Sequence, residues 1–145
     1  MKMIFPILTI FYFFIVTSLN AGNPASDNKP GIKFFQGTFE EALKLAKDEN
    51  KLLFVDVYAT WCGPCKRMDA VTFVNAEVGE YFNERFVNLK IDGEKGQGPT
   101  IRQRYNVRGY PTLLFLNHKG EVITSTAGFR DPQRFLELGR SVPGK

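Results

Sequence analysis

The chain contains two cysteines, which lie three residues apart in the segment Trp61-Cys62-Gly63-Pro64-Cys65-Lys66. Residues at this spacing are neighbours on a helix, so Cys62 and Cys65 are close enough to form a disulfide with each other. A disulfide across so short a loop removes little loop-closure entropy and adds little to stability. Reversible opening and closing of the bond is therefore the chemistry that this spacing favours.

Cys62 follows an apolar run at residues 52–58, typical of a buried strand, and begins a segment rich in helix-forming residues. Free N–H groups and the helix dipole at a helix N-terminus stabilise an anion, so we expect a lowered thiol pKa for Cys62. Pro64 fits the first helical turn, where its missing N–H costs nothing, and Gly63 keeps the approach to the sulfur open. A low thiol pKa stabilises the reduced form, so it tunes the redox poise more than the rate of attack.

The cysteine pair could instead bind a metal. A structural zinc site needs four ligands, and the chain adds only one histidine, His118, in a predicted turn. We therefore predict no zinc site and no cofactor. A two-coordinate Cu(I) site formed by the two thiolates is the alternative.

The surrounding sequence predicts one α/β domain, which suits a chain of 145 residues. The expected strands are residues 32–35, 52–58, 86–92, 112–116 and 122–127. The expected helices are residues 39–49, 61–71, 76–82 and 99–105, and a last one that starts at Pro132. Strands and helices in this order predict a mixed sheet sandwiched between helices.

Residues 1–21 have the pattern of a secretory signal peptide. Lys2 precedes an apolar stretch at residues 4–16, and small and polar residues follow as far as Ala21. The stretch is shorter than the roughly 20 residues that a membrane-spanning helix needs. We expect cleavage after Ala21, with an uncleaved N-terminal anchor as the alternative.

The polar, turn-rich residues 22–31 are predicted to be a linker, and the folded domain is predicted to occupy residues 32–145. The formal net charge is only +4, and the lysines and arginines are scattered without a basic run. We therefore expect no nucleic-acid partner.

Three features resemble the thioredoxin family over residues 32–141. They are the Trp-Cys-Gly-Pro-Cys-Lys segment after an apolar strand, Asp56 six residues before Cys62, and the segment Gly109-Tyr110-Pro111-Thr112. The resemblance implies a thioredoxin-like three-layer sandwich with a mixed central sheet. It also implies catalysis through a dithiol–disulfide cycle of Cys62 and Cys65.

Asp56 is the third candidate catalytic residue. Desolvation within an apolar strand should raise the pKa of its carboxyl group, which suits a proton acceptor near neutral pH. The resemblance implies that Asp56 assists the deprotonation of Cys65. The alternative is a structural aspartate paired with a nearby lysine.

The resemblance also implies a substrate-binding surface. In the family, Pro111 would form a cis peptide beside the disulfide and leave the Tyr110 backbone free to pair with a substrate strand. An ordinary trans proline is the alternative. Trp61 would be an exposed docking residue or, alternatively, a buried packing residue, and Gly128 would keep the groove open. The implied substrate-binding residues are Trp61, Gly63, Pro64, Tyr110, Pro111 and Gly128.

Two positions depart from cytosolic thioredoxins. Asn88 stands where they usually carry a lysine, and residues 68–71 lack their helix-kinking proline. Residues 72–78 instead resemble a secreted thioredoxin-like branch, which includes the C-terminal domain of the bacterial transmembrane thiol reductant carrier. This similarity favours an exported protein with a narrower role.

The resemblance thus implies an exported monomeric thiol–disulfide oxidoreductase that reduces disulfides of protein substrates. The expected location is the periplasm, with secretion or membrane anchoring as alternatives, and the expected electron donor is a membrane thiol protein. Disulfide oxidases and isomerases of the family tend to place a histidine between the cysteines, whereas Gly63-Pro64 resembles the reducing members. Oxidation, isomerisation and a non-catalytic Cu(I) or thiol chaperone are the alternative functions.

Overall fold

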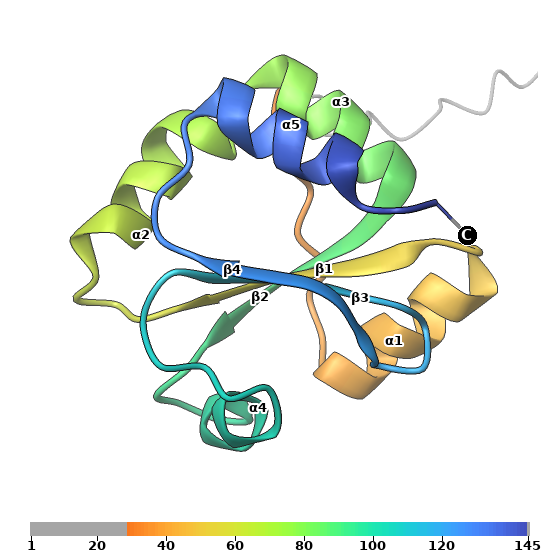
Figure 1. The fold of residues 1–145 in the computed structure, drawn as a ribbon, viewed down its shortest axis with the longest axis vertical. Helices are drawn as coiled ribbons and strands as arrows, with labels where there is room; N and C mark the ends of the chain where they lie inside the picture. Colours follow the sequence, from red (N-terminus) through yellow and green to blue (C-terminus); the bar gives the residue numbers. More distant parts are fainter. Residues whose placement is uncertain (1–28, 145) are drawn as a thin grey trace, which may run out of the picture.

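Four strands form one mixed sheet with helices on both faces (Figure 1). The computed structural model describes residues 29–144. The elements are α1 (Phe39–Asp48), β1 (Leu52–Tyr58), α2 (Gly63–Arg67), the π-helical turn η1 (Met68–Thr72), α3 (Ala76–Arg85), β2 (Phe86–Asp92), α4 (Gly98–Arg104), β3 (Thr112–Leu116), β4 (Val122–Ala127) and α5 (Pro132–Ser141). The strand order is β2-β1-β3-β4, with β1 parallel to β2 and β3 antiparallel to both β1 and β4. This arrangement confirms the predicted three-layer sandwich.

Side-chain caps fix the N-termini of the three longest helices. The Thr38 hydroxyl accepts a hydrogen bond from the Glu41 N–H (3.2 Å), and the Glu41 carboxylate accepts one from the Thr38 N–H (2.7 Å). Asn75 and Asp131 cap α3 and α5 through their side-chain oxygens. The helix starts predicted at residues 39, 76 and 132 are therefore confirmed.

The predicted strand at residues 32–35 is wrong. Only one bridge is present there, between Phe34 and Asn88. Backbone N–H groups of this segment donate to Phe73 O, Asn83 Oδ1 and Asn88 O, which belong to three different parts of the chain. Because no single strand supplies successive partners, the segment forms no ladder along β2.

The predicted helix at residues 61–71 is divided in two. It starts later, with Cys62 as the N-cap of α2, and it changes at Met68 into the π-helical turn η1. The last bond of that turn runs from the Phe73 N–H to Met68 O (2.9 Å). The helix predicted at 76–82 continues to Arg85, and the remaining helix ends shift by one residue, as frayed ends commonly do.

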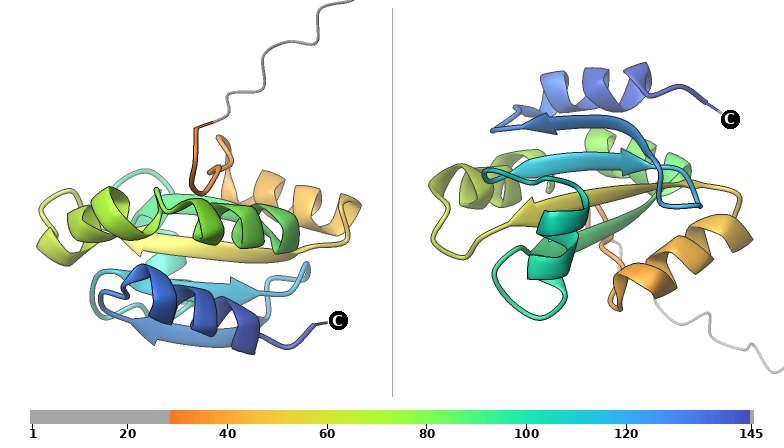
Figure 2. Two further views of the ribbon diagram at one scale, coloured as in Figure 1. Left: turned by 90° about the horizontal axis from the view of Figure 1, so that it is seen from above. Right: turned by 60° about the horizontal axis from the view of Figure 1, so that its bottom comes forward.

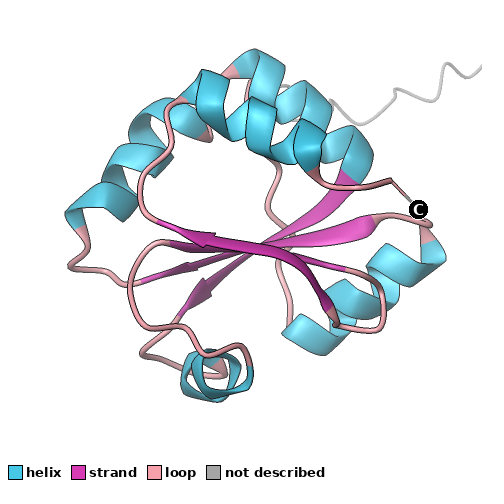
Figure 3. Ribbon diagram, viewed as in Figure 1, coloured by secondary structure: helices cyan, strands magenta, loops and turns pink. Residues whose placement is uncertain are grey.

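The two faces of the sheet have different cores, and Figure 2 shows the helices that cover each one. The aliphatic face packs against α1 and α4 and includes Leu53, Val55, Val57, Leu89, Ile91, Leu114 and Leu116. The aromatic face packs against η1, α3 and α5 and includes Phe54, Phe73, Phe82, Phe86, Phe115 and Phe135. Helix α2 lies on the same side of the sheet, as Figure 3 also shows in the view of Figure 1. Side chains alternate along a strand, so Asp56, between Val55 and Val57, lies on the aromatic face.

Within residues 29–144, no helix combines the length and the apolar character needed to cross a membrane. The predicted signal peptide and residues 22–28 of the predicted linker lie outside the described residues. Gly31, near the start of the described chain, is buried against Gly79 of α3.

Candidate active site

The two cysteines form the disulfide that their spacing predicts. Their Cα atoms are 5.3 Å apart, and the Cys65 N–H donates a hydrogen bond to Cys62 Sγ (3.1 Å). Cys62 is thus the N-cap of α2 through its own sulfur. An anionic acceptor strengthens such a bond, so this geometry supports a stabilised thiolate at Cys62 after the disulfide opens.

The disulfide is more enclosed than the sequence suggests. Both cysteine residues are only 2% exposed, because Tyr58, Ala59 and Tyr110 pack around them. The exposed Gly63 provides the opening: a Cβ atom at this position would meet no other atom within 4 Å. The space beside Gly63 is therefore open, and its role in the approach of a substrate stays a prediction.

Trp61 is exposed and held in a fixed orientation. Its side chain is 67% exposed, its ring contacts the Tyr110 ring edge-to-face (5.9 Å between centroids), and Nε1 donates to Glu94 Oε2 (3.0 Å). The buried alternative for Trp61 is therefore wrong. An exposed indole with a fixed orientation provides an apolar surface beside Cys62.

The Tyr110–Pro111 peptide bond is cis, so the trans alternative is wrong. Within the described residues, the Tyr110 backbone forms no hydrogen bond, whereas Pro111 O accepts one from the Gly128 N–H (2.8 Å). Gly128 has φ +91°, a conformation that favours glycine. Its backbone conformation thus gives a reason for glycine there besides the open groove.

Asp56 is both buried, as expected for a carboxyl group with a raised pKa, and paired with a lysine, as in the structural alternative. The residue is fully buried, and its Oδ2 atom lies 3.1 Å from Lys90 Nζ on the neighbouring strand. Burial raises the pKa of Asp56 to about 6, an effect that Lys90 opposes and the negative charge of Asp69 reinforces. A carboxyl group with this pKa can accept a proton near neutral pH.

Lys90 is the site residue that the sequence reasoning missed. It lies two residues after Asn88, on the same face of β2, and its ammonium group is paired with Asp69 of η1 as well as with Asp56. The ammonium also lies 4.8 Å from the ring centre of Tyr58 and 5.1 Å from that of Phe73. The sequence did contain a signal for Lys90. Cytosolic thioredoxins usually carry a lysine at the position of Asn88, and side chains two residues apart on a strand lie on the same face, so Lys90 could occupy the same side of β2.

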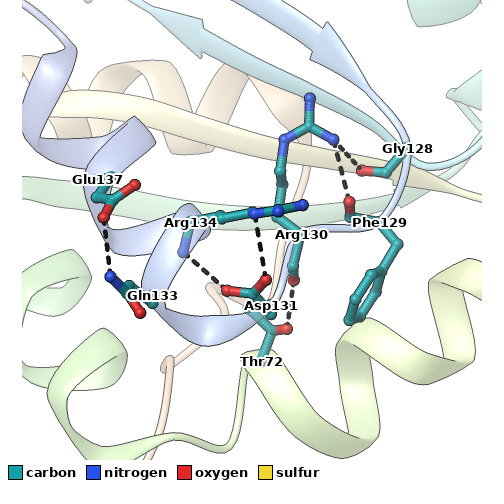
Figure 4. A network of polar contacts seen from close by, with 8 residues as sticks. All are labelled: Thr72, Gly128, Phe129, Arg130, Asp131, Gln133, Arg134 and Glu137. Atoms are coloured by element: carbon teal, nitrogen blue, oxygen red, sulfur yellow. Dashed lines mark hydrogen bonds and ion pairs between the residues drawn. The ribbon is translucent and has the colours of Figure 1, made fainter.

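The loop between β4 and α5 closes one side of the site. Arg130 folds back so that Nη1 donates to Phe129 O (3.0 Å) and Nη2 to Thr126 Oγ1 (2.8 Å). The Arg130 carbonyl accepts a hydrogen bond from Thr72 Oγ1 (2.6 Å), as Figure 4 shows. These bonds connect the loop that contains Gly128 to the η1 turn.

Metal-ligating residues do not cluster in the described part of the chain. No group of three or more His, Cys, Asp or Glu side chains is placed to hold a metal ion there. His118 lies in the turn between β3 and β4, and the cysteines are joined to each other.

A mixed four-stranded sheet, a disulfide at a helix N-terminus packed against the tyrosine of a cis Tyr-Pro bond, and a buried carboxylate on the preceding strand together define a thioredoxin-type redox domain. The family model of the thioredoxin-like domain matches residues 39–143, so the chain belongs to this family. It is a thioredoxin-like thiol–disulfide oxidoreductase with Cys62–Cys65 as its CXXC disulfide.

The thiol:disulfide interchange protein DsbD of Yersinia pestis is 30% identical over 102 residues, which cover 68% of this chain and 17% of DsbD. The chain thus spans about a sixth of that relative. A solved structure of a proposed disulphide isomerase from Bacteroides thetaiotaomicron is 50% identical, with coverages of 79% and 98% and a TM-score of 0.68. The oxidised C-terminal domain of Neisseria meningitidis DsbD shares the fold at 24% identity, with coverages of 77% and 100% and a TM-score of 0.63. The predicted similarity to a transmembrane thiol reductant carrier of this family is confirmed.

Proposed function

We propose that this oxidoreductase reduces disulfides in exported proteins. The observation that carries the proposal is the Cys62–Cys65 pair itself, in which Cys62 Sγ accepts the Cys65 N–H. The fully buried Asp56 lies on β1, the strand that leads into the cysteine segment. The hydrogen bond to Cys62 Sγ favours a Cys62 thiolate, and Asp56, whose pKa burial raises to about 6, would supply a proton acceptor for Cys65.

The reaction transfers two electrons from the reduced pair to the substrate. The Cys62 thiolate attacks one sulfur of the substrate disulfide, which forms a mixed disulfide and releases the other substrate sulfur as a thiolate. Cys65 then loses its proton to Asp56 and attacks Cys62 Sγ, so the second substrate thiolate leaves. The protein ends as the observed Cys62–Cys65 disulfide.

Export and the source of electrons are further parts of the proposal. The signal-peptide pattern of residues 1–21 supports export to the periplasm. Turnover there requires an electron donor, and similarity to a thiol:disulfide interchange protein supports a membrane thiol protein in that role. The protein substrates would contact the exposed Trp61 and pair with the free Tyr110 backbone.

Isomerisation is the second candidate function, because the Bacteroides relative with 50% identity is described as a proposed isomerase. The redox potential separates the two. We expect equilibration with glutathione to give a value near that of thioredoxin, about −270 mV. A value near that of protein disulfide isomerase, about −180 mV, would exclude the reductase assignment.

Substitutions of the cysteines test the mechanism. The full chain without residues 1–21 should accelerate insulin reduction by a dithiol, and Cys62→Ser should abolish this activity. Cys65→Ser should accumulate mixed disulfides with substrates in cells, whereas the double variant Cys62→Ser/Cys65→Ser serves as the control and should trap none. Stoichiometric Cu(I) binding without insulin reduction would favour the chaperone alternative instead.

A further inference from the structure

Three exposed cations lie next to the disulfide without acidic partners. Lys66 and Arg67 directly follow Cys65 on α2, and Arg108 lies two residues before Tyr110 in the loop that leads to the cis peptide. Within residues 29–144, none of these three side chains forms an ion pair. Positive charge therefore flanks the site from two separate elements.

The neighbouring carboxylates, in contrast, are already engaged. Asp56 and Asp69 share Lys90, Asp92 accepts from the Glu94 N–H, Glu94 accepts from the Trp61 indole, and Asp131 caps α5. Each of these carboxylates keeps its negative charge, but within residues 29–144 none of them lies within ion-pair distance of Lys66, Arg67 or Arg108. The three cations near the disulfide thus remain unpaired among the described residues.

Arg67 is held at the edge of the substrate-binding surface. Its guanidinium carbon lies 4.4 Å from the centre of the Phe129 ring, and Phe129 follows Gly128, whose N–H is bonded to Pro111 O. Stacking on an aromatic ring fixes the plane of a guanidinium and leaves its edge free for two parallel bonds to a carboxylate. Arg67 is therefore already oriented to receive an acidic side chain.

Arg130 makes a useful contrast with Arg67. Its guanidinium donates to Gly128 O and Phe129 O, as Figure 4 shows, and also to Thr126 Oγ1, so it holds its own loop. Arg108 is different again: only its Nε atom is bonded, to Asn106 Oδ1 (3.2 Å). The terminal nitrogens of Arg108 are free to meet a ligand.

We infer that the substrates are protein disulfides whose cysteines are flanked by Asp or Glu side chains, which Arg67, Arg108 and Lys66 select. This inference rests on the proposed reductase function and adds the substrate class. Complementary charges around a binding surface speed the encounter and favour one partner over others. Apolar contact with the exposed Trp61 would accompany this selection.

Synthetic peptides provide the test. Each peptide carries one disulfide, and the residues beside one of its cysteines are Glu, Gln or Lys, placed before that cysteine, after it, or on both sides. The rate constant for reduction by the reduced protein is measured at low and high ionic strength. We expect the Glu peptides to react about tenfold faster than the Lys peptides at low ionic strength, with a smaller ratio at high ionic strength, where salt screens surface charges.

Charge reversal identifies the residues responsible. Arg67→Glu and Arg108→Glu should each reduce the preference for Glu peptides about threefold, and the double variant should nearly abolish it. Lys119→Glu is the matched control, because Lys119 is an exposed cation without an ion pair in the turn between β3 and β4. It changes the net charge equally and should leave the preference intact.

The outcomes separate this inference from the proposed function. Equal rates for the Glu, Gln and Lys peptides would overturn the substrate class, while reduction itself would still support the reductase. A loss of preference in Lys119→Glu equal to that in Arg67→Glu would overturn it too, since net charge alone would then be responsible. Failure to reduce any peptide or insulin would overturn both proposals.

Discussion

The two faces of the sheet differ in what they bury, although the same strands supply both. On the aliphatic face, β1 contributes Leu53, Val55 and Val57, packed against α1 and α4. On the aromatic face, β1 contributes Phe54 and the fully buried Asp56. Within residues 29–144, the fully buried charge thus lies on the aromatic face and not on the aliphatic one.

The aromatic face is also densely packed around that charge. The Phe54 ring lies between 5.1 and 5.4 Å, centre to centre, from the rings of Phe82, Phe115 and Phe135. Aromatic pairs at such distances contribute beyond their buried area. The stabilising ring cluster and the destabilising carboxylate thus share one core. The described core residues of the aliphatic face include no buried carboxylate.

Among the variants that test the difference between the two faces, Phe54→Ala should have the largest effect on stability. Loss of the Phe54 ring and of its contacts with four neighbouring aromatic rings should lower the free energy of unfolding by about 4 kcal/mol. The matched variant Val55→Ala, on the opposite face of the same strand, should cost only about 2 kcal/mol. Urea unfolding of the oxidised protein measures both, and equal costs would contradict the unequal roles of the two faces.

Asp56→Asn should stabilise the protein, and the gain should appear as the pH rises above about 4. The unfolded carboxyl group has a pKa near 3.8 and the folded one a pKa of about 6, so the folded state binds the proton more tightly. Stability of the wild type must therefore fall as the pH rises from about 4 to 6. The variant should gain up to about 3 kcal/mol above pH 6, and little below pH 4.

Asp56→Asn should lose activity although it gains stability. Without the carboxylate, deprotonation of Cys65 loses its acceptor, and insulin reduction at pH 7 should slow by up to about 100-fold. Urea unfolding at several pH values and the insulin assay together check the prediction. A variant as active as the wild type, or one whose added stability does not depend on pH, would show that Asp56 lacks this role.

Lys90→Met should raise the pKa of Asp56 above its value of about 6, because the positive charge of Lys90 lowers it. The rise in insulin reduction with pH should move to higher pH, and stability at pH 8 should fall by about 1–2 kcal/mol. Lys90→Arg keeps the charge and should restore both properties. A pH–rate profile that is the same in Lys90→Met and wild type would separate Lys90 from the reaction.

Local sequence signals were sufficient for most of the fold. All four sheet strands have their predicted bounds, since each is a continuous or alternating apolar run that ends at a turn, and the helix starts follow from capping residues such as Thr38. The disulfide follows from a spacing of three residues. These features depend only on neighbours along the chain.

The parts of the site that the sequence did not reveal depend on contacts between distant segments. Pairing of Asp56 with Lys90 requires the register of β1 against β2, which no local pattern encodes. The burial of Cys62 depends on Tyr110, from another loop, and residues 32–35 lose their strand because their partners lie on separate parts of the chain. The roles implied for Trp61, Pro111 and Gly128 in substrate binding stay predictions.

The smallest effect is expected at the exposed edge of the aromatic face, from Asp69→Asn. Asp69 is about half exposed, so losing its ion pair with Lys90 should change stability by less than about 1 kcal/mol. Its negative charge raises the pKa of Asp56, and its removal also leaves Lys90 to Asp56 alone. Both effects lower the pKa of Asp56, so the pH–rate profile should shift to lower pH, opposite to Lys90→Met.

Comparison of the two variants with the double variant Lys90→Met/Asp69→Asn sharpens this result. If Asp69 acts partly through Lys90, its removal should shift the profile less when Lys90 is already absent. A shift of Asp69→Asn to higher pH, or one that is unchanged in the Lys90→Met background, would show that Asp69 does not act on the buried carboxylate through Lys90. The double variant thus separates the direct effect of Asp69 on the pKa of Asp56 from its effect through Lys90.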